Sequence, residues 1–309
     1  MSASQRDVKT RIGSVKNIQK ITRAMEMVAA ARLRRAEQRI EALRPYAGAI
    51  RRMTRQAAEA AGNVPNLPIL NEHESEGTVG LLLVTGDRGL AGAFNSQIVR
   101  AGLKAGREHE GDGRGVVFSA VGRRGVSSLN FRGREPKGAF TGFTDRPAYA
   151  NAREIASELV AAYVDGEVDR VEIVYNRYVS PLTQEVTRET LLPLQEATIL
   201  EGGEETLGGR AAEEEDAKAE PGKHALVEYE PDPEAILHRL IPAYVEISIY
   251  RALLESTASE HGARMTAMRS ASENAGDIIK DLTLEFNRER QAAITQEIME
   301  VVAGAESLV

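Results

Sequence analysis

Three glycines are the residues of this 309-residue chain whose spacing comes closest to a chemical motif. Gly86, Gly89 and Gly92 follow the apolar run Val79–Val84 and precede a helical stretch, a position where backbone amides can bind a phosphate. Their spacing is G-x-x-G-x-x-G, not the G-x-G-x-x-G of dinucleotide sites, and no Gly-Lys-Ser/Thr follows. We therefore interpret them as a structural turn between a strand and a helix.

Other side chains capable of chemistry are scattered along the chain. The five histidines include no pair at metal-ligand spacing, and for His261, which falls in a helical repeat, a packing or polar-contact role is favoured over metal binding. Cysteine is absent, which excludes disulfides and thiolate sites. No Ser, Lys or Asp is arranged as a nucleophile with its base. We expect no catalytic residue, no metal site and no cofactor.

The middle of the chain, residues 77–195, alternates strands with helices. Val79–Val84 is a continuous apolar run, typical of a strand covered on both faces, and Val116–Val121 and Val171–Tyr175 are similar. Helical stretches near 95–108 and 148–164 lie between them, which predicts right-handed crossovers and a parallel sheet. Glu185–Leu194 alternates apolar and polar residues, which indicates a strand at the sheet edge. We expect a Rossmann-like α/β domain, the foot of the molecule.

The N-terminal arm, residues 1–60, is basic and predicted to be helical. It carries fourteen Lys and Arg against five acids, although the whole chain has a net charge of −7. Apolar or small residues recur there at steps of three and four, as on a helix face packed against another helix: Val15, Ile18, Thr22, Met25, Ala29, Leu33, Ala36, Ile40, Leu43, Ala47 and Ile50. Two steps of four around Ala29 indicate a stutter. Pro45 is expected to kink or break the helix near Arg44.

The C-terminal arm, residues 232–309, is predicted to be a second long helix. Asp232 is its expected N-cap, and Pro233 takes the first helical position. Pro242 is expected to interrupt the first turns. A seven-residue repeat then continues for more than four heptads: Leu254, Ala258, His261, Met265, Met268, Ser272, Ala275, Ile279, Leu282 and Phe286. Before this arm, the Glu- and Gly-rich residues 201–223 have too few apolar side chains to fold and are predicted to be an acidic mobile loop.

The two arms are expected to pair. A helix from Ala243 to Leu308 would be ~100 Å long, far larger than the ~14 Å radius of gyration of the foot, and a single helix is not stable alone. The fold class is therefore α/β with a long antiparallel two-helix coiled coil. Its C-terminal end is apolar nearly all round and is expected to bind a partner: Ile294, Ile298, Val301, Val302 and Leu308.

Four segments resemble the gamma subunit of bacterial F-type ATP synthases. They are RIGSVKNIQKITRAMEMVAA (11–30), TGDRGLAGAFN (85–95), SEHGARMTAMRSASENAGDIIKDLT (259–283) and RQAAITQE (290–297). The resemblance implies a non-catalytic central rotor shaft that couples proton flow to ATP synthesis or hydrolysis. Its partners would be the alpha and beta subunits of the catalytic head, the epsilon subunit and the membrane ring of c subunits.

The resemblance also implies where these partners bind. Arg23, Met25 and Glu26, and separately Arg290 and Gln291, would contact the beta subunit, whose acidic lever would face the basic residues of the N-terminal arm. The apolar C-terminal end would turn in a bearing. The chain would lie on the cytoplasmic face of the bacterial cell membrane and reach the membrane only through partners. One departure is the lack of cysteine, which excludes the redox switch that chloroplast relatives carry near residues 201–223.

Two alternatives remain at the level of sequence. A coiled-coil α/β enzyme could bind a nucleotide in the glycine loop. A nucleic-acid-binding coiled coil would use the basic arm, although Tyr46 is its only aromatic residue and stacking platforms are missing; no nucleic acid is expected. Ligand binding by the isolated chain would favour the first alternative, and salt-dependent DNA retention would favour the second.

Overall fold

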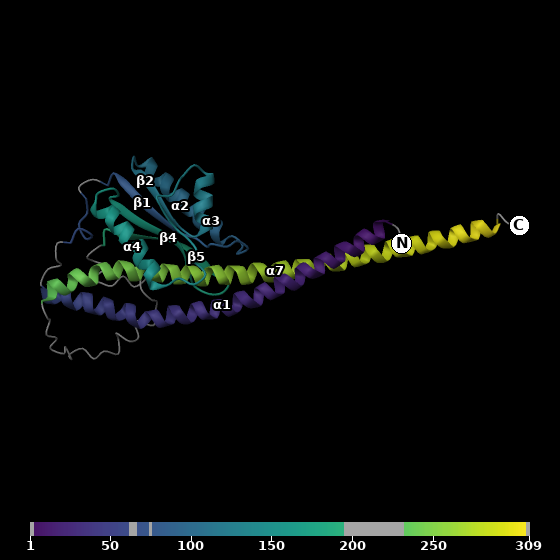
Figure 1. The fold of residues 1–309 in the computed structure, drawn as a ribbon, viewed down its shortest axis with the longest axis horizontal. Coiled ribbons are helices and arrows are strands. Elements are labelled where there is room, and N and C mark those ends of the chain that lie inside the picture. Colours follow the sequence, from purple (N-terminus) through teal and green to yellow (C-terminus); the bar gives the residue numbers. More distant parts are fainter. Residues whose placement is uncertain (1–2, 62–66, 74–75, 195–231, 307–309) are drawn as a thin grey trace. The chain divides into compact units, whose positions relative to one another are not determined.

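The chain divides into two compact units that share two long helices. The computed structural model describes residues 3–61, 67–73, 76–194 and 232–306. Unit 1 comprises Met1–Ala31 and Arg264–Val309, and unit 2 comprises Arg32–Ala263. Helices α1 (Ala3–Ala61) and α7 (Pro233–Glu306) each contribute to both units (Figure 1). The predicted acidic loop, residues 201–223, lies outside the described residues.

Both long helices continue through a proline. Pro45 was expected to kink or break the helix near Arg44. The helix is not broken there, since Pro45 lies inside the 59 residues of α1. Pro242 likewise lies inside the 74 residues of α7, so the expected interruption there was wrong. A proline leaves the carbonyl four residues earlier without its helical donor. Those carbonyls belong to Glu41 and His238, both exposed, where water can replace the lost donor.

Unit 2 is built on a five-stranded sheet. In spatial order its strands are β3 (Gly138–Phe140), β2 (Gly115–Val121), β1 (Thr78–Val84), β4 (Arg170–Tyr178) and β5 (Gln184–Leu192). All neighbours are parallel except β4 and β5, so the predicted parallel sheet and its edge strand are confirmed. The sequence analysis missed α3 (Arg123–Phe131) and β3, because a nine-residue helix and a three-residue strand are too short to show a period.

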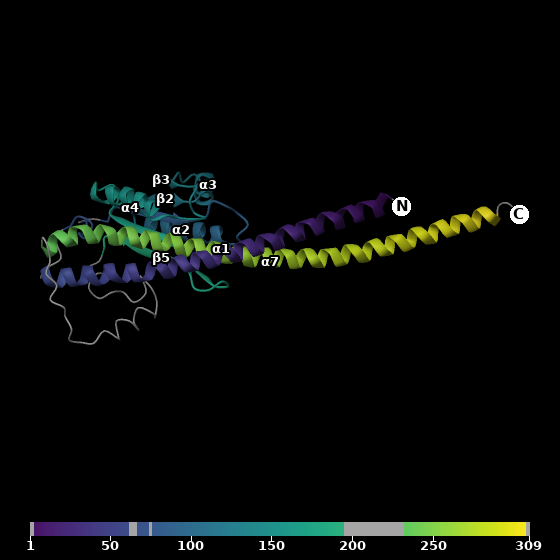
Figure 2. The same cartoon turned by 60° about the horizontal axis from the view of Figure 1, so that its bottom comes forward.

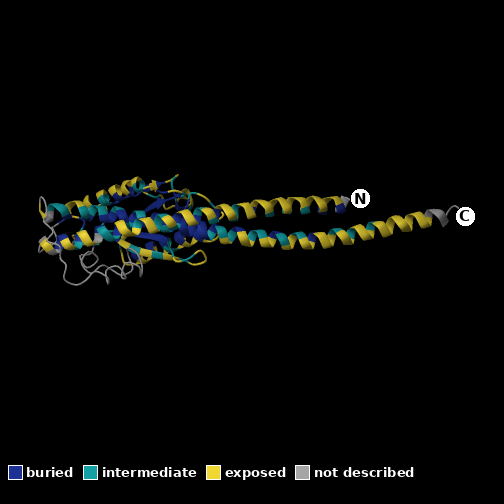
Figure 3. Ribbon diagram, turned by 90° about the horizontal axis from the view of Figure 1, so that it is seen from below, coloured by how far each residue is buried: buried dark blue, intermediate teal, exposed yellow. Residues whose placement is uncertain are grey.

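Helices cover both faces of this sheet. Leu81 and Leu83 point to one face, where they pack with residues of α2 (Phe94–Gly111) and α3. Leu82 and Val84 point to the other, where they join a cluster with α4 (Tyr149–Val164) and the unit 2 parts of α1 and α7. Figure 3 shows that buried residues are concentrated in this unit.

Unit 1 is an antiparallel pair of helices, α1 up to Ala31 and α7 from Arg264 (Figures 1 and 2). A Cβ at Gly276 would lie 3.1 Å from the Gln19 side-chain nitrogen. Seven residues further along α1, Glu26 pairs with Arg269, seven residues earlier in α7, at 2.9 Å. The two contacts fix the direction and register of the pair. Together with the α/β sheet of unit 2, they confirm the predicted fold class.

The buried stripe of α1 differs from the predicted one. Ile18, placed in the seam by the sequence analysis, is 53% exposed. Buried and half-buried positions can be followed at steps of four and three: Val8, Ile12, Val15, Gln19, Thr22, Glu26, Ala29, Leu33 and Ala36. Met25 of the predicted stripe is half-buried as well. Gln19 replaces Ile18 because its amide can donate to the Ser272 carbonyl at 3.2 Å. In unit 1, the predicted stripe of α7 is confirmed from Met265 to Phe286.

Gly102 tests the close packing of α2 on the sheet. A Cβ at this position would lie 2.2 Å from Leu83, which is fully buried. We expect Gly102→Ala to lower the free energy of unfolding by about 1–3 kcal/mol through overpacking, despite the higher helix propensity of alanine. The measurement is urea unfolding followed by circular dichroism.

Gly111→Ala is the matched control, since it lies in the same helix and a Cβ there would meet nothing within 4 Å. We expect this control to unfold within about 1 kcal/mol of the wild type. Equal stability of the Gly102→Ala variant and the wild type would contradict the packing described for α2.

Candidate functional site

The glycine loop between β1 and α2 is occupied by contacts within the fold. The amide of Gly86 donates to the Asn95 side-chain oxygen at 2.8 Å, and the amide of Asp87 donates to the Thr144 hydroxyl at 2.9 Å. A Cβ at Gly86 would lie 2.7 Å from the carboxyl group of Glu260 on α7, so a larger residue there would displace this buried side chain. Two of the amides that could have held a phosphate are therefore already used.

The other two loop glycines have different surroundings. Gly92 adopts a φ of +54°, a conformation that glycine reaches without strain. A Cβ at Gly89 would lie 3.0 Å from the end of the flexible Arg124 side chain. Leu90, between them, also has a positive φ of +62° and is 66% exposed. The loop is thus a tight turn whose backbone packs closely against two side chains, Glu260 of α7 and Arg124 of α3.

Asp87 is the polar centre of this turn, which the sequence analysis did not single out. Its carboxylate accepts hydrogen bonds from the amides of Gly142, Arg123 and Thr144 at 3.0–3.2 Å and from the Thr144 hydroxyl at 2.9 Å. Burial raises the pKa of this carboxyl, but the hydrogen bonds outweigh it and hold the pKa below its ordinary value. A carboxylate here would also repel a phosphate.

A basic pocket lies where α1, α7 and the segment before α4 meet within unit 2. Arg32, Arg35 and Arg39 line it from α1, Arg146 from the segment before α4, and it encloses about 270 Å³. Arg32 forms an ion pair with Asp145, the only acidic residue of the lining. The surplus of positive charge suits a carboxylate from another protein.

His261 contributes to the same pocket from α7. Its side chain is 2% exposed and its Nε2 lies 3.7 Å from the Asp145 carboxylate. The sequence analysis assigned His261 to packing or a polar contact, and this geometry is of that kind. The spacing of Arg32, Arg35 and Arg39 at i, i+3 and i+7 was visible in the sequence. That Arg146 and His261 line the same pocket could not be predicted from it.

A buried ionic cluster joins α7 to β5, and the sequence analysis missed it. Arg251 is 6% exposed and donates to Glu189 at 2.7 Å, and Tyr175 donates to the same carboxylate at 2.7 Å. Glu255 lies 3.6 Å from Arg251, and burial raises its pKa although Arg251 opposes the shift. Because removing one partner would leave a buried charge unpaired, this cluster fixes α7 against the sheet edge.

The residues predicted to contact a partner lie at two levels of unit 1. Arg23 is exposed and Met25 is half-buried, whereas Glu26 is engaged by Arg269 within the helix pair. Arg290 and Gln291 are exposed on α7, about 20 residues beyond Arg269. At 1.5 Å per residue the two groups are about 30 Å apart along α7. The structure does not bring them into one site.

The last turns of α7 have no partner helix among the described residues. The register that sets Gln19 opposite Gly276 sets Ala3, where α1 begins, opposite about residue 292. In Figures 1 and 2 the yellow end of α7 extends past the purple start of α1. The predicted apolar residues there are 48–73% exposed: Ile294, Ile298, Val301 and Val302. Leu308, predicted with them, lies outside the described residues.

The described part of the chain lacks two further features. None of its helices is long and apolar enough to cross a lipid bilayer. No group of three or more His, Asp or Glu side chains there could hold a metal ion.

The sequence is similar to known proteins over nearly the whole length of the chain. The sequence matches the family model described as ATP synthase over residues 4–308. It is 43% identical to the ATP synthase gamma chain of Moorella thermoacetica over 306 residues, which cover 99% of each chain. It is also 43% identical to that of Streptomyces coelicolor, with coverage of 100% of this chain and 97% of the relative.

Solved structures with a similar fold come from mitochondrial ATP synthases. A chain of the central stalk and c-ring of the Tetrahymena thermophila enzyme superimposes with a TM-score of 0.58 and 25% identity, covering 82% of this chain and 99% of that one. A chain of the Euglena gracilis enzyme in rotational state 3 superimposes with a TM-score of 0.66 and 18% identity, covering 99% and 94%.

The contacts of Asp87 predict an acid-dependent loss of stability. Asp87→Asn replaces a carboxylate that accepts several hydrogen bonds, so we expect a loss of about 1–3 kcal/mol in unfolding free energy at pH 7. Because the folded-state pKa is lower than the ordinary 3.8, the carboxylate contributes fully above that value, and its contribution disappears as the pH falls through the folded-state pKa. The gap between wild type and variant should therefore narrow below about pH 4.

Urea unfolding at pH 7, 4 and 3 measures this gap. The control is Asp165→Asn, an exposed carboxylate at the end of α4, which should change stability by less than about 0.5 kcal/mol. A gap between Asp87→Asn and wild type that stays constant from pH 7 to pH 3 would exclude the proposed role of the ionised carboxylate.

Proposed function

The chain belongs to the family of ATP synthase gamma chains, and from that premise we propose how its two units work as the central rotor shaft of the enzyme. A gamma chain is a subunit of the membrane-associated ATP synthase complex and forms the shaft of its rotor. The observation that carries the proposal is the antiparallel helix pair of unit 1, whose longer helix ends in an apolar surface that no described residue of the chain covers.

The apolar end of α7 is proposed to turn in a bearing formed by the alpha and beta subunits. Its exposed side chains, such as Ile298 and Val301, would each gain about 1.5–3 kcal/mol on full burial. Hydrophobic contacts are non-directional, so they can persist while the shaft rotates. Hydrogen bonds or ion pairs would have to break and reform during each turn.

Torque is proposed to pass to the beta subunit at two levels of unit 1. Arg23, Met25 and Glu26 form the first contact, and Arg290 and Gln291 form the second. The ion pair between Glu26 and Arg269 supports this division of roles, because it holds the helices together and leaves Arg23 free to meet a partner. Exposed ion pairs are worth only about 0–1 kcal/mol, so the shape of the helix pair should carry most of the torque.

The foot, residues 77–195 within unit 2, is proposed to rest on the epsilon subunit and the ring of c subunits. Both long helices are bonded to it: Tyr178 of β4 donates to Glu37 of α1 at 2.5 Å, and Arg251 of α7 donates to Glu189 of β5. These contacts would keep the helices from turning against the sheet. When the foot rotates, both helices would therefore rotate with it.

The basic pocket is proposed to receive an acidic segment of the beta subunit as the shaft turns. Its four arginines against a single Asp145 support this assignment. The catalytic nucleotide sites are assigned to other subunits, because the Gly86 and Asp87 amides are already bonded to Asn95 and Thr144. The complex is placed on the cytoplasmic face of the bacterial cell membrane, with membrane contact through partner subunits only.

Truncation before Ile294 tests the bearing. Removing residues 294–309 should weaken copurification with alpha and beta subunits about tenfold or more, because the proposed bearing surface is lost. Thermal unfolding of unit 2 should stay unchanged, since none of its described residues lies in the deleted part. The measurement is the yield of complex per mole of shaft subunit.

A matched variant separates apolarity from length. Serine at the four exposed positions keeps the helix but removes the apolar surface: Ile294, Ile298, Val301 and Val302. This variant should assemble as poorly as the truncated chain. If the truncated chain copurifies as well as the full chain does, the bearing assigned to these residues does not exist.

A crosslink at Arg290 tests rotation against the beta subunit. Because the chain has no cysteine, Arg290→Cys gives one unique attachment point on the shaft. Bifunctional crosslinking to beta in the assembled complex should abolish steady-state ATP hydrolysis in proportion to its yield. A monofunctional reagent on the same cysteine is the control and should leave most of the activity. Undiminished hydrolysis in fully crosslinked complexes would rule out rotation at this contact.

A further inference from the structure

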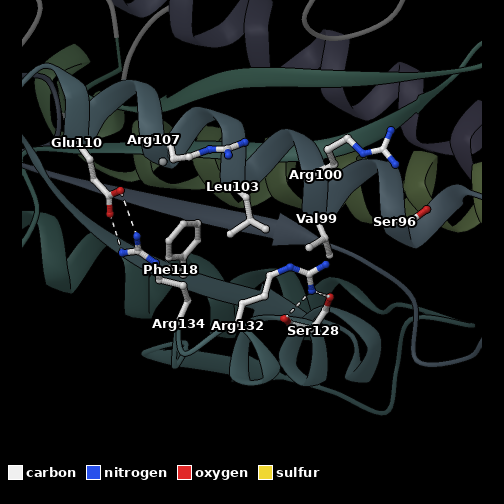
Figure 4. Close-up of a pocket in the computed structure, with 11 residues that line it drawn as sticks. Ser96, Val99, Arg100, Leu103, Arg107, Glu110, Phe118, Ser128, Arg132 and Arg134 are labelled. Carbon is white, nitrogen blue, oxygen red and sulfur yellow. Dashed lines mark hydrogen bonds and ion pairs between the residues drawn. The ribbon is translucent and has the colours of Figure 1, made fainter.

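A groove that shares no residue with the proposed beta-subunit contacts or bearing runs between α2 and α3. Its upper wall is α2 from Ser96 to Glu110, and its lower wall is the segment from Ser128 to Arg134 (Figure 4). The groove follows four turns of α2, about 21 Å at 1.5 Å per residue, and encloses about 430 Å³. An ion pair between Arg134 and Glu110 at 2.6 Å bridges the walls at one end.

The floor of this groove is apolar. Leu103 of α2 and Phe118 of β2 point into it in Figure 4, together with Val99. Phe118 and Val99 are buried and Leu103 is half-buried, so Leu103 offers most of the apolar contact. Residue 106 is glycine, and a Cβ there would lie 2.8 Å from the Phe118 ring, so the ring packs directly against the backbone of α2 and closes the floor.

The rim of the groove is basic and consists of arginines. Arg100 and Arg107 lie on the same face of α2 as Leu103, and both are exposed. Neither has an ion pair within the described residues. Arg132, on the opposite wall, donates to the carbonyl and hydroxyl of Ser128 at 2.9 and 2.7 Å and stays exposed. The only acid of the lining, Glu110, is already paired with Arg134.

A second hollow continues the groove past Ser128. It encloses about 350 Å³ and is lined by Arg124 and by Phe131, which is 89% exposed. An exposed phenylalanine beside arginines is typical of protein interfaces, where aromatic residues and arginine are enriched and lysine is depleted. This basic surface belongs to a chain whose overall net charge is −7, so it is a local feature and not a consequence of composition.

We propose that the α2–α3 groove binds an acidic, amphipathic segment of a partner protein, with an apolar side chain on Leu103 and carboxylates on Arg100, Arg107 and Arg132. Guanidinium groups bind carboxylates through paired hydrogen bonds, and an apolar floor between charged rims fits an amphipathic helix laid in a groove. The inference does not rest on the rotor role, since no residue assigned to the shaft contacts lines this groove.

Two other occupants fit less well. A small anion would leave most of a 21 Å groove and its apolar floor unused. A single-stranded nucleic acid needs several exposed aromatic faces for the stacking of successive bases. The linings of the groove and the second hollow supply one, Phe131, because Phe118 is only 5% exposed. Glu110 at one end would also repel phosphates. Charge complementarity together with the apolar floor therefore favours a protein segment.

The test uses the full chain and a fluorescein-labelled synthetic peptide of fourteen residues. The peptide is an amphipathic helix with leucines on one face and glutamates on the other, and a second peptide carries lysines in place of the glutamates. Fluorescence anisotropy measures binding to the wild type and to the double variant Arg100→Glu/Arg107→Glu. The matched control, Lys104→Glu/Arg153→Glu, has the same net charge but changes exposed residues outside the groove.

The acidic peptide should bind the wild type and the control variant with equal affinity. Its affinity for the groove variant should be lower by about tenfold or more. Binding should also weaken as salt is raised from 50 to 300 mM, because exposed charges are screened. Leu103→Ala should weaken it independently of salt. Thermal unfolding of each variant confirms that the fold is kept.

Several results would overturn the proposal. They are equal binding of the acidic and lysine peptides, equal binding to the groove variant and the wild type, or no binding of the acidic peptide at all. Binding of inorganic phosphate that requires Arg100 and Arg107, without binding of the peptide, would identify a small-anion site instead. Tighter binding of a single-stranded oligonucleotide with the same arginine dependence would identify a nucleic-acid surface.

Discussion

The structure depends on the need of two very long helices to bury an apolar stripe. Helices of 59 and 74 residues gain too little from intrinsic propensity to be stable in isolation. In unit 1, each helix covers the stripe of the other, and small residues such as Ala29 and Ala275 sit on the buried faces. The two ends of the chain must therefore pair, and they can do so only in opposite directions.

The two units hold these helices by different kinds of contact. In unit 2 the helices are fixed by directional bonds, such as those of Arg251 to Glu189 and of Tyr178 to Glu37. In unit 1 a narrow stripe is supplemented by a few polar contacts, of which Glu26 with Arg269 is an ion pair. A shaft requires this division, since its base has to be locked to the foot while its end keeps a non-directional surface for rotation.

Patterns within one element were predictable from the sequence, and contacts between distant segments were not. The stripe of α7 was predicted correctly because it is long and regular. On α1, Ile18 was chosen over Gln19 because hydrophobicity alone cannot anticipate an amide bonded to a carbonyl of the opposite helix. The sequence analysis did not single out Arg251, although the apolar residues near it on both sides were a signal of burial. The basic pocket assembles segments more than 100 residues apart, and no single-sequence pattern reports that.

The most direct test of the account is the distance between spin labels on the two arms, measured by pulsed electron paramagnetic resonance in the assembled complex. The chain has no cysteine, so pairs of exposed residues can be labelled cleanly: Arg23 with Glu273, and Lys9 with Asn287. Because packed helix axes lie about 8–10 Å apart, both pairs should give distances of about 15–30 Å. The offset pair Lys9 with Glu273 should be longer, since its labels are fourteen residues, about 21 Å, apart along α7. Distances beyond about 45 Å for the first two pairs would show that the arms do not form one shaft.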